Sequence, residues 1–314
     1  MKNASPDSQD EWTIHALNIH GVFFERWCQR VITDTPGWSV RSVNYPVEFP
    51  APNGPMRGKE SSLDIRAEHL EDDELLALAI ECKKNNPDFV NWVFFMKGMQ
   101  GESRRQYALA QIRNRATEPD HQRTWDTGST IRTCRTSLPV CGEARETKSD
   151  YLSVRGNDRS KTKTSNAAIQ DAAYQVALAR QAITMEELRF SGLLGSAPSI
   201  NALLVRMPWV RQSIVPVIVT TAALYVCDFD PIDVDGQTGE IQVCEASLRE
   251  CDSLIFEYPL PKHLQMEPGD WRSVLLAGSM EIFTRMHIFV VRSSYVGTFL
   301  QRSSAMMMDG DETT

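Results

Sequence analysis

Two acids and a lysine, Asp64, Glu81 and Lys83, are the residues whose types and spacing best suit chemistry in this sequence. Residues 61–84 read SSLDIRAEHLEDDELLALAIECKK, a pattern that predicts two strands joined by an acidic turn. A hairpin symmetric about that turn places Asp64 opposite Glu81, because antiparallel partners keep a constant sum of residue numbers. Since side chains alternate along a strand, one face of the hairpin gathers Asp64, Glu81 and Lys83.

Facing carboxylates on neighbouring strands repel each other unless a cation lies between them. Oxygen ligands with few neighbours suit Mg²⁺ or Mn²⁺, which are hard cations that retain bound water. The sequence therefore predicts a magnesium site at Asp64 and Glu81, with manganese as an alternative occupant.

An aspartate, a gap and then Glu-x-Lys on adjacent strands resembles the PD-(D/E)XK nuclease superfamily. Upstream, residues 21–40 read GVFFERWCQRVITDTPGWSV and resemble the first helix of the resolvase-like and restriction-like members, with Glu25 in the expected order. Downstream, Gln170 and Tyr174 match the Gln-x-x-x-Tyr helix motif of the branch that includes the RecB-type nucleases. Residues 62–64 depart from the pattern, since they read Ser-Leu-Asp where the superfamily's name has a proline before the aspartate.

The resemblance implies an α/β fold in which a restriction-endonuclease-like mixed central sheet is flanked by helices. It also implies that Asp64, Glu81 and the backbone carbonyl of Cys82 hold one or two magnesium ions. Lys83 would orient or activate the attacking water beside the scissile phosphate. The implied activity is metal-dependent hydrolysis of phosphodiester bonds in nucleic acid, with DNA favoured and RNA as the alternative substrate.

Three further residues receive site roles from the same resemblance. Glu25 would add a metal ligand through water, and Gln170 and Tyr174 would steady Lys83 or the phosphate. Each also has an ordinary structural interpretation. Glu25 suits the solvated face of a helix, Gln170 a surface position, and Tyr174 a half-buried aromatic position.

The chain is expected to divide into a nuclease-like core and a C-terminal portion. Residues 13–190 form the predicted core, with residues 98–164 as an insertion. Residues 191–306 form a C-terminal α/β portion that extends the same sheet or packs against it. Residues 1–12 and 307–314 are expected to be flexible tails.

The predicted insertion is basic, although the whole chain carries a net charge of −8. Residues 101–163 contain 13 Lys or Arg against 8 Asp or Glu. The segment lacks a sustained period and is expected to be irregular, with a helical stretch near QYALAQIRNR, residues 106–115. It could be a solvated loop or a basic flap that contacts phosphates. The arginines expected to bind nucleic acid are Arg104, Arg105, Arg113, Arg115 and Arg123.

Composition excludes several other classes. The 314 residues include 42% apolar residues, enough for a substantial core, and the net negative charge argues against coating nucleic acid by bulk electrostatics. The longest apolar run, residues 214–227, is too short to span a bilayer, and the N-terminus lacks a secretory signal. Seven cysteines without a Cys-x-x-Cys pair favour reduced thiols. We therefore expect a cytoplasmic protein that does not associate with membranes.

Two rival classes stay open at this stage. One is a binding module that has the nuclease fold but is non-catalytic, or active only with a partner. The other is a structural or assembly protein, which would leave the basic segment unexplained. The sequence also leaves open whether the chain forms a homo-oligomer or binds a regulatory protein, and fold alone does not choose among biological settings.

Overall fold

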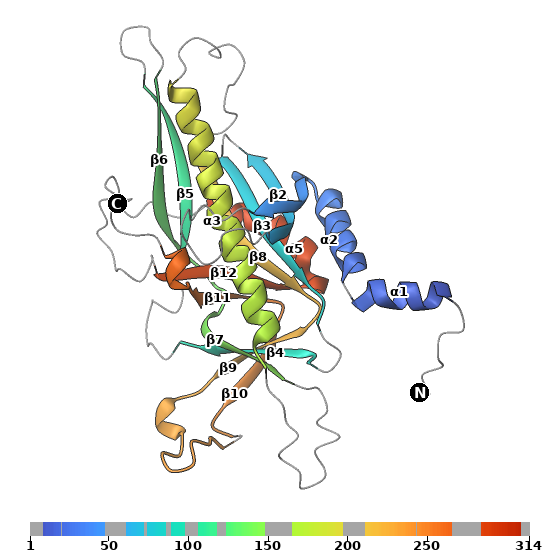
Figure 1. The fold of residues 1–314 in the computed structure, drawn as a ribbon. Coiled ribbons are helices and arrows are strands. Elements are labelled where there is room, and N and C mark those ends of the chain that lie inside the picture. Colours follow the sequence, from blue (N-terminus) through green and yellow to red (C-terminus); the bar gives the residue numbers. More distant parts are fainter. Residues whose placement is uncertain are drawn as a thin grey trace.

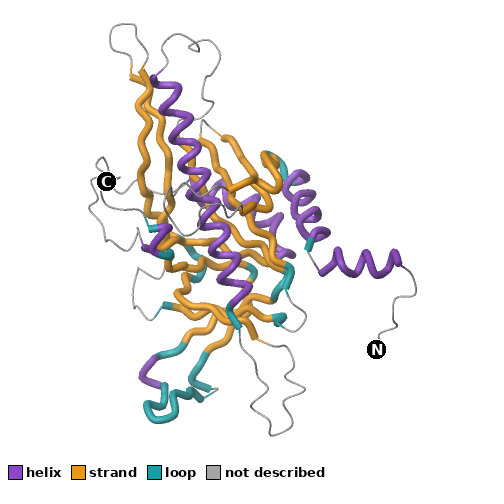
Figure 2. Tube along the Cα trace, viewed as in Figure 1, coloured by secondary structure: helices purple, strands orange, loops and turns teal. Residues whose placement is uncertain are grey.

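One large mixed sheet with helices on both faces organises the molecule, which we describe from a computed structural model (Figures 1 and 2). The predicted mixed α/β class with a central sheet flanked by helices is thereby confirmed. No described helix is long and apolar enough to cross a membrane. The structure describes residues 9–19, 21–47, 61–71, 74–85, 89–97, 106–117, 124–147, 165–196, 211–242, 244–265 and 284–308.

Two helices begin the described chain, α1 (Gln9–Ile19) and α2 (Val22–Asp34). Gly21 caps the start of α2 with a positive φ of 79°, a conformation that glycine adopts without the steric cost of a side chain. Residues 9–12, which we expected in a flexible tail, form the start of α1. At the other terminus, α5 (Val296–Met308) includes the first two residues of the expected C-terminal tail.

The first three strands form an antiparallel meander. They are β1 (Trp38–Val47), β2 (Ser61–Glu71) and β3 (Glu74–Lys83). The pairs between β2 and β3 run from Glu71 opposite Glu74 to Ile65 opposite Ile80. All of them keep the constant sum of residue numbers that the sequence predicts, so the register of the hairpin is confirmed.

A long helix then carries the chain back across the sheet. Helix α3 (Ala167–Ser196) packs on one face and is followed by β8 (Arg211–Thr220), which lies parallel to β3. Parallel neighbours need such a crossover connection. Because helices cover both faces here, β3 is nearly all apolar and does not alternate with polar residues.

The described strands of the C-terminal portion belong to the same sheet, which is one of the two arrangements that the sequence left open. The strand order is β1-β2-β3-β8-β12-β11-β7-β4-β9-β10, with β5 and β6 off this path. The remaining strands on the path are β4 (Asn91–Met96), β7 (Val140–Thr147), β9 (Ala223–Asp228), β10 (Ser247–Cys251), β11 (Ser253–Pro259) and β12 (Arg285–Arg292).

The expectation of an irregular insertion with a helix near residues 106–115 is wrong. Those residues lie in β5 (Gln106–Thr117), which forms a hairpin with β6 (Thr124–Arg135) and also pairs with β8. Tyr107 and Leu109 are buried on the same side of β5, and Ile112 is buried in the core on the opposite side. The strand is therefore fixed by burial and by pairing with β8, contacts that its local sequence does not reveal.

Two apolar cores fill the space on either side of the sheet. One lies under α3 and contains Ala173 and Ala177 of that helix. The other contains Cys28 and Ile32 of α2 together with Phe299 of α5. Strand β3 contributes to both, since its successive residues point to opposite faces.

A buried arginine joins the meander to α3. Arg66 of β2 is 7% exposed, and its Nη2 lies 2.7 Å from Oε1 of Glu187 and 2.8 Å from Oε1 of Glu68. The guanidinium also lies 5.9 Å from the centre of the Tyr45 ring, whose hydroxyl donates a hydrogen bond to Glu186. These contacts fix α3 across the strands that carry the predicted site.

We expect Arg66→Ala to lower the free energy of unfolding by about 3 kcal/mol, because the substitution leaves partly buried carboxylates without their cation. Urea unfolding followed by circular dichroism measures the change. Arg30→Ala is the matched control, since the Arg30–Asp34 pair is exposed on α2 and should contribute far less to stability than the contacts of Arg66. Equal small losses in both variants would mean that Arg66 does not anchor α3.

Candidate active site

Asp64, Glu81 and Lys83 meet at one end of β2 and β3. Asp64 Oδ2 accepts a hydrogen bond of 2.7 Å from the backbone N–H of Cys82. This bond joins the two strands beyond Ile65 and Ile80, the last residues that pair between them. Lys83 Nζ lies 2.9 Å from Oε1 of Glu81, whose residue is only 2% exposed. The side chain of Cys82 points to the opposite face, into the core with Cys28, as the alternation predicts.

The two acids stand in an environment that disfavours their charge. Burial raises the pKa of Asp64 to about 6, although the hydrogen bond from Cys82 acts in the other direction. Burial, followed by the nearby charge of Asp64, raises the pKa of Glu81 to about 8. Without a cation, Glu81 therefore carries a proton at neutral pH. A pair of desolvated carboxylates is a donor set that fits a divalent cation, which would stabilise both charges.

Glu25 lies near this pair, on the buried side of α2. It is half-buried, and its charge raises the pKa of both Asp64 and Glu81. The described residues contain no group of three His, Cys, Asp or Glu side chains arranged to hold a metal ion by themselves. Magnesium is commonly held by one or two carboxylates while water fills its other positions. The prediction that Glu25 adds a ligand through water is compatible with this placement.

The helix residue that reaches the acids is Gln175, which the sequence pattern did not identify. With its amide nitrogen toward Glu81, Gln175 donates to both carboxylate oxygens, and the distance to Oε2 is 3.2 Å. Tyr174, in contrast, has its hydroxyl 3.2 Å from Nε2 of His263, and the two rings lie 5.8 Å apart. Gln170 is half-buried in the first turn of α3. The expected roles of Gln170 and Tyr174 beside Lys83 stay predictions.

We expect Gln175→Ala to lower the cleavage rate by about 10-fold to 100-fold with little change in substrate affinity, because Gln175 orients a site acid. Single-turnover rates and binding constants measured in calcium separate the two effects. Gln170→Ala is the matched comparison, and it should cost less. The reverse order would mean that the motif match, and not the observed contact, identifies the important glutamine.

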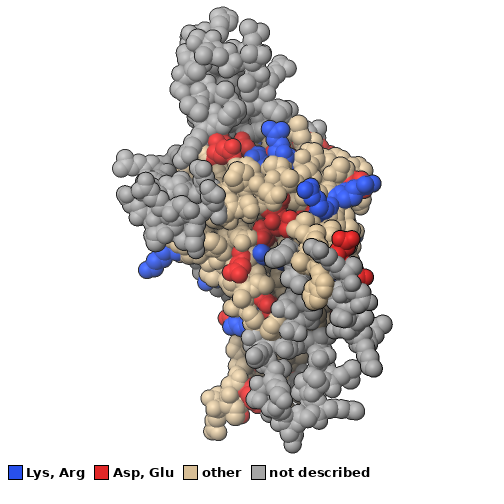
Figure 3. All heavy atoms as spheres, turned by 45° about the vertical axis from the view of Figure 1, so that its right-hand side comes forward, with Lys and Arg blue, Asp and Glu red and all other residues tan. Residues whose placement is uncertain are grey.

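The arginines predicted to bind nucleic acid are only partly described. Arg113 and Arg115 belong to β5, where Arg113 pairs in register with Arg211 of β8. Arg104, Arg105 and Arg123 lie outside the described residues. On the face seen in Figure 3, acidic side chains gather near the middle, and lysine or arginine side chains lie above and beside them.

Comparison with known proteins finds no matching family model, no matching curated protein and no matching solved structure. The chemistry of the site is therefore the basis on which a function can be assigned to this chain.

Proposed function

We propose that this chain is a metal-dependent nuclease that hydrolyses phosphodiester bonds, with DNA favoured over RNA. The observation that supports this function most strongly is the buried pair of Asp64 and Glu81 with Lys83 beside it. Paired acids suit a divalent cation, and an adjacent ammonium group suits a phosphate. A purely structural role gives no reason to bury two acids whose charges oppose each other.

Asp64, Glu81 and the carbonyl of Cys82 are the groups that would hold Mg²⁺, or Mn²⁺ in its place. When bound, the cation polarises the phosphoryl group and lowers the pKa of bound water. Lys83, whose side chain is 26% exposed, would orient the attacking water and attract the phosphate. Gln175 restrains the carboxylate of Glu81 through its amide.

The fold supports the same proposal. A mixed sheet flanked by helices is what the resemblance to the PD-(D/E)XK nucleases implies, and the three motif residues occupy strands β2 and β3 in the predicted register. The restriction-endonuclease-like identity of the fold is part of this proposal. Four segments separated in the sequence, in α2, β2, β3 and α3, contribute to the site.

A second candidate is a nuclease-fold module that is non-catalytic or that needs a partner for activity. The observation that favours gating is the 2.9 Å contact between Lys83 Nζ and Glu81 Oε1, which engages the ammonium group that the water and phosphate would use. A homo-oligomer or a regulatory protein could rearrange this pair on binding. Activity of the purified chain alone would argue against a required partner.

The proposed function is tested by incubating the purified protein with supercoiled plasmid, linear duplex, single-stranded DNA and RNA, each with Mg²⁺ or EDTA. Cleavage of at least one substrate in Mg²⁺ and none in EDTA is expected. Binding in Ca²⁺ without cleavage in Mg²⁺ or Mn²⁺ would favour the binding module. Neither binding nor cleavage would favour a structural or assembly protein.

A further inference from the structure

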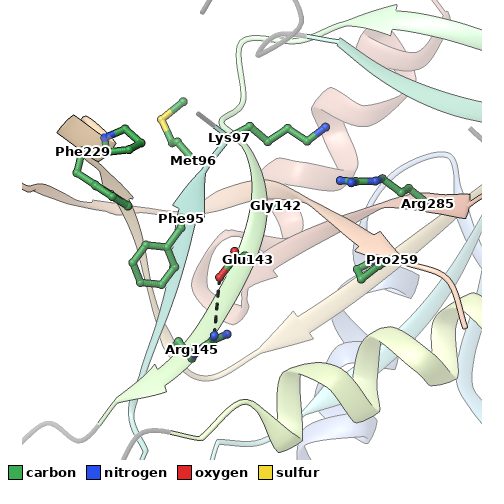
Figure 4. A pocket seen from close by; sticks show the side chains of 10 residues that line it. Phe95, Met96, Lys97, Gly142, Glu143, Arg145, Phe229, Pro259 and Arg285 are labelled. Atoms are coloured by element: carbon green, nitrogen blue, oxygen red, sulfur yellow. Dashed lines mark ion pairs between the residues drawn. The ribbon is translucent and has the colours of Figure 1, made fainter. Parts of the chain in front are cut away.

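A cationic and aromatic pocket lies outside the cluster of acids (Figure 4). It has a volume of about 670 Å³ and is formed where β4 and β11 end, along the first half of β7, at the start of β12, and at the turn after β9. The residues that matter for its chemistry are two phenylalanines, three cations and a glycine: Phe95, Phe229, Lys97, Arg145, Arg285 and Gly142.

Strand register separates this pocket from the candidate active site. Glu81 of β3 pairs with Ile218 of β8, which in turn pairs with Val290 of β12. Arg285 of the pocket precedes Val290 by five residues, about 17 Å along an extended strand. The two sites are therefore distinct, and ligand binding in the pocket does not depend on the proposed nuclease function.

Two of the cations converge on one buried acid. Arg285 Nη1 lies 2.7 Å from Oε1 of Glu257, and Lys97 pairs with the same carboxylate. Glu257 is 2% exposed, whereas the side chain of Arg285 is 41% exposed. Together the two side chains carry two positive charges against the single negative charge of Glu257. This part of the pocket therefore has excess positive charge that an incoming anion can use.

A neighbouring histidine does not add to that charge. Nδ1 of His287 accepts a hydrogen bond from the backbone N–H of Ala108, so its proton lies on Nε2, 3.7 Å from Oε2 of Glu257. Burial, and then the charges of Lys97 and Arg285, lower the pKa of His287 to about 4. The cluster of Lys97, Arg285, Glu257 and neutral His287 has a formal charge of +1 at neutral pH.

The pocket wall opposite the cations is apolar, and the floor of the pocket is open. Phe95 and Phe229 meet edge to face, with ring centres 6.3 Å apart and planes at 89°. Gly142 of β7 lies in the floor, where an added Cβ would stand 3.4 Å from Cγ of Lys97. The absence of a side chain at this position keeps the pocket open beside the lysine. Arg145 also lines it, and its Nη2 lies 3.7 Å from Oε2 of Glu143.

We propose that this pocket binds a nucleoside monophosphate or a closely similar ligand, in which a planar aromatic ring is joined to a phosphate. The ring would pack on Phe95 and Phe229, and the phosphate would contact Lys97 and Arg285. The volume lies within the usual range for small-molecule sites, about 300–1,000 Å³. Phosphate alone would leave the aromatic wall unused, and a nucleoside alone would leave the cations unused.

Isothermal titration calorimetry in EDTA tests the proposal with AMP, GMP, CMP, UMP, adenosine and inorganic phosphate as probes. At least one monophosphate is expected to bind. Adenosine should bind at least about tenfold more weakly than AMP, and inorganic phosphate at least about tenfold more weakly than the best monophosphate. Phe95→Leu and Arg285→Gln should each weaken binding about tenfold. Gly142→Leu should remove it by filling the floor. Arg292→Gln, at the other end of β12, is the matched control and should bind normally.

Each variant is compared with wild type by its urea unfolding transition, so that a loss of fold is not read as a loss of binding. Asp64→Asn must bind the monophosphates as well as wild type does. The pocket proposal would be overturned if nucleotide binding were lost in Asp64→Asn but retained in Gly142→Leu. It would also be overturned if none of the monophosphates bound. Neither result bears on cleavage, which the substrate panel measures separately.

Discussion

Lys83→Ala is expected to lower the single-turnover cleavage rate by about a thousandfold while leaving the fold intact. Lys83 places its ammonium group 2.9 Å from Oε1 of Glu81, and its side chain is partly exposed at the end of β3 and lies outside both apolar cores. Its removal should cost transition-state stabilisation beyond any loss of stability, which the urea unfolding transition of the variant measures. Asp64→Ala should abolish cleavage in the same way, because it removes one of the two acids.

Lys84→Ala is the matched control for this experiment. Lys84 is the next residue in the chain and is exposed, and its Nζ donates a hydrogen bond of 2.6 Å to the backbone carbonyl of Asn18. It should keep nearly all of the wild-type rate. Wild-type cleavage by a verified Lys83→Ala preparation, or an equal loss in Lys84→Ala, would show that Lys83 has no special role.

The second large effect concerns stability and pH. In the metal-free protein, Glu81→Gln is expected to raise the free energy of unfolding at pH 8 by roughly 3 kcal/mol. Burial raises the pKa of Glu81 from an ordinary 4.5 to about 8 in the folded state, so the folded protein holds a proton that the unfolded chain has lost. The stability linked to that proton is present below pH 4.5 and is lost as the pH rises to about 8. The stability of Glu81→Gln relative to the wild type should therefore increase from pH 5 to pH 8.

Urea unfolding in EDTA at several pH values measures this effect. Glu74→Gln, at the opposite end of β3, is the control and should keep the wild-type profile. Added Mg²⁺ should stabilise the wild type at pH 8 more than it stabilises Glu81→Gln, because a carboxylate binds the cation more tightly than a neutral amide does. A stability difference between Glu81→Gln and the wild type that stays constant from pH 5 to pH 8 would contradict the assigned environment of Glu81.

The sequence was sufficient for the hairpin because two local signals agree there. An acidic turn fixes the centre of the hairpin, and the side-chain period of two then determines which residues face each other. The predicted register of β2 and β3 is the observed one, and Asp64 bonds to the backbone next to Glu81. The longest apolar run, residues 214–227, covers most of β8 and β9, since such a run must be buried in a sheet.

The sequence was not sufficient where distant contacts decide the structure. Residues 106–115 contain Ala, Leu, Gln and Arg, which favour a helix, yet they form β5 because they pair with β6 and β8. The motif selects Gln170 and Tyr174, but the rotation of α3 about its axis brings Gln175 to Glu81. That rotation depends on contacts such as Arg66 with Glu187, which are 121 positions apart.

Binding of Mn²⁺ is the most direct test of the claim that Asp64 and Glu81 form a divalent-metal site. Calorimetric titration at pH 7, repeated in buffers with different ionisation enthalpies, measures both the affinity and the protons released. Because Glu81 holds a proton at this pH, the wild type should bind Mn²⁺ and release close to one proton for each ion bound at the pair. Asp64→Asn and Glu81→Gln should each lose this binding. At higher pH, Mn²⁺ should fully occupy the wild-type site. Mn²⁺ binding that both variants retain unchanged, or no binding by the wild type, would contradict the account.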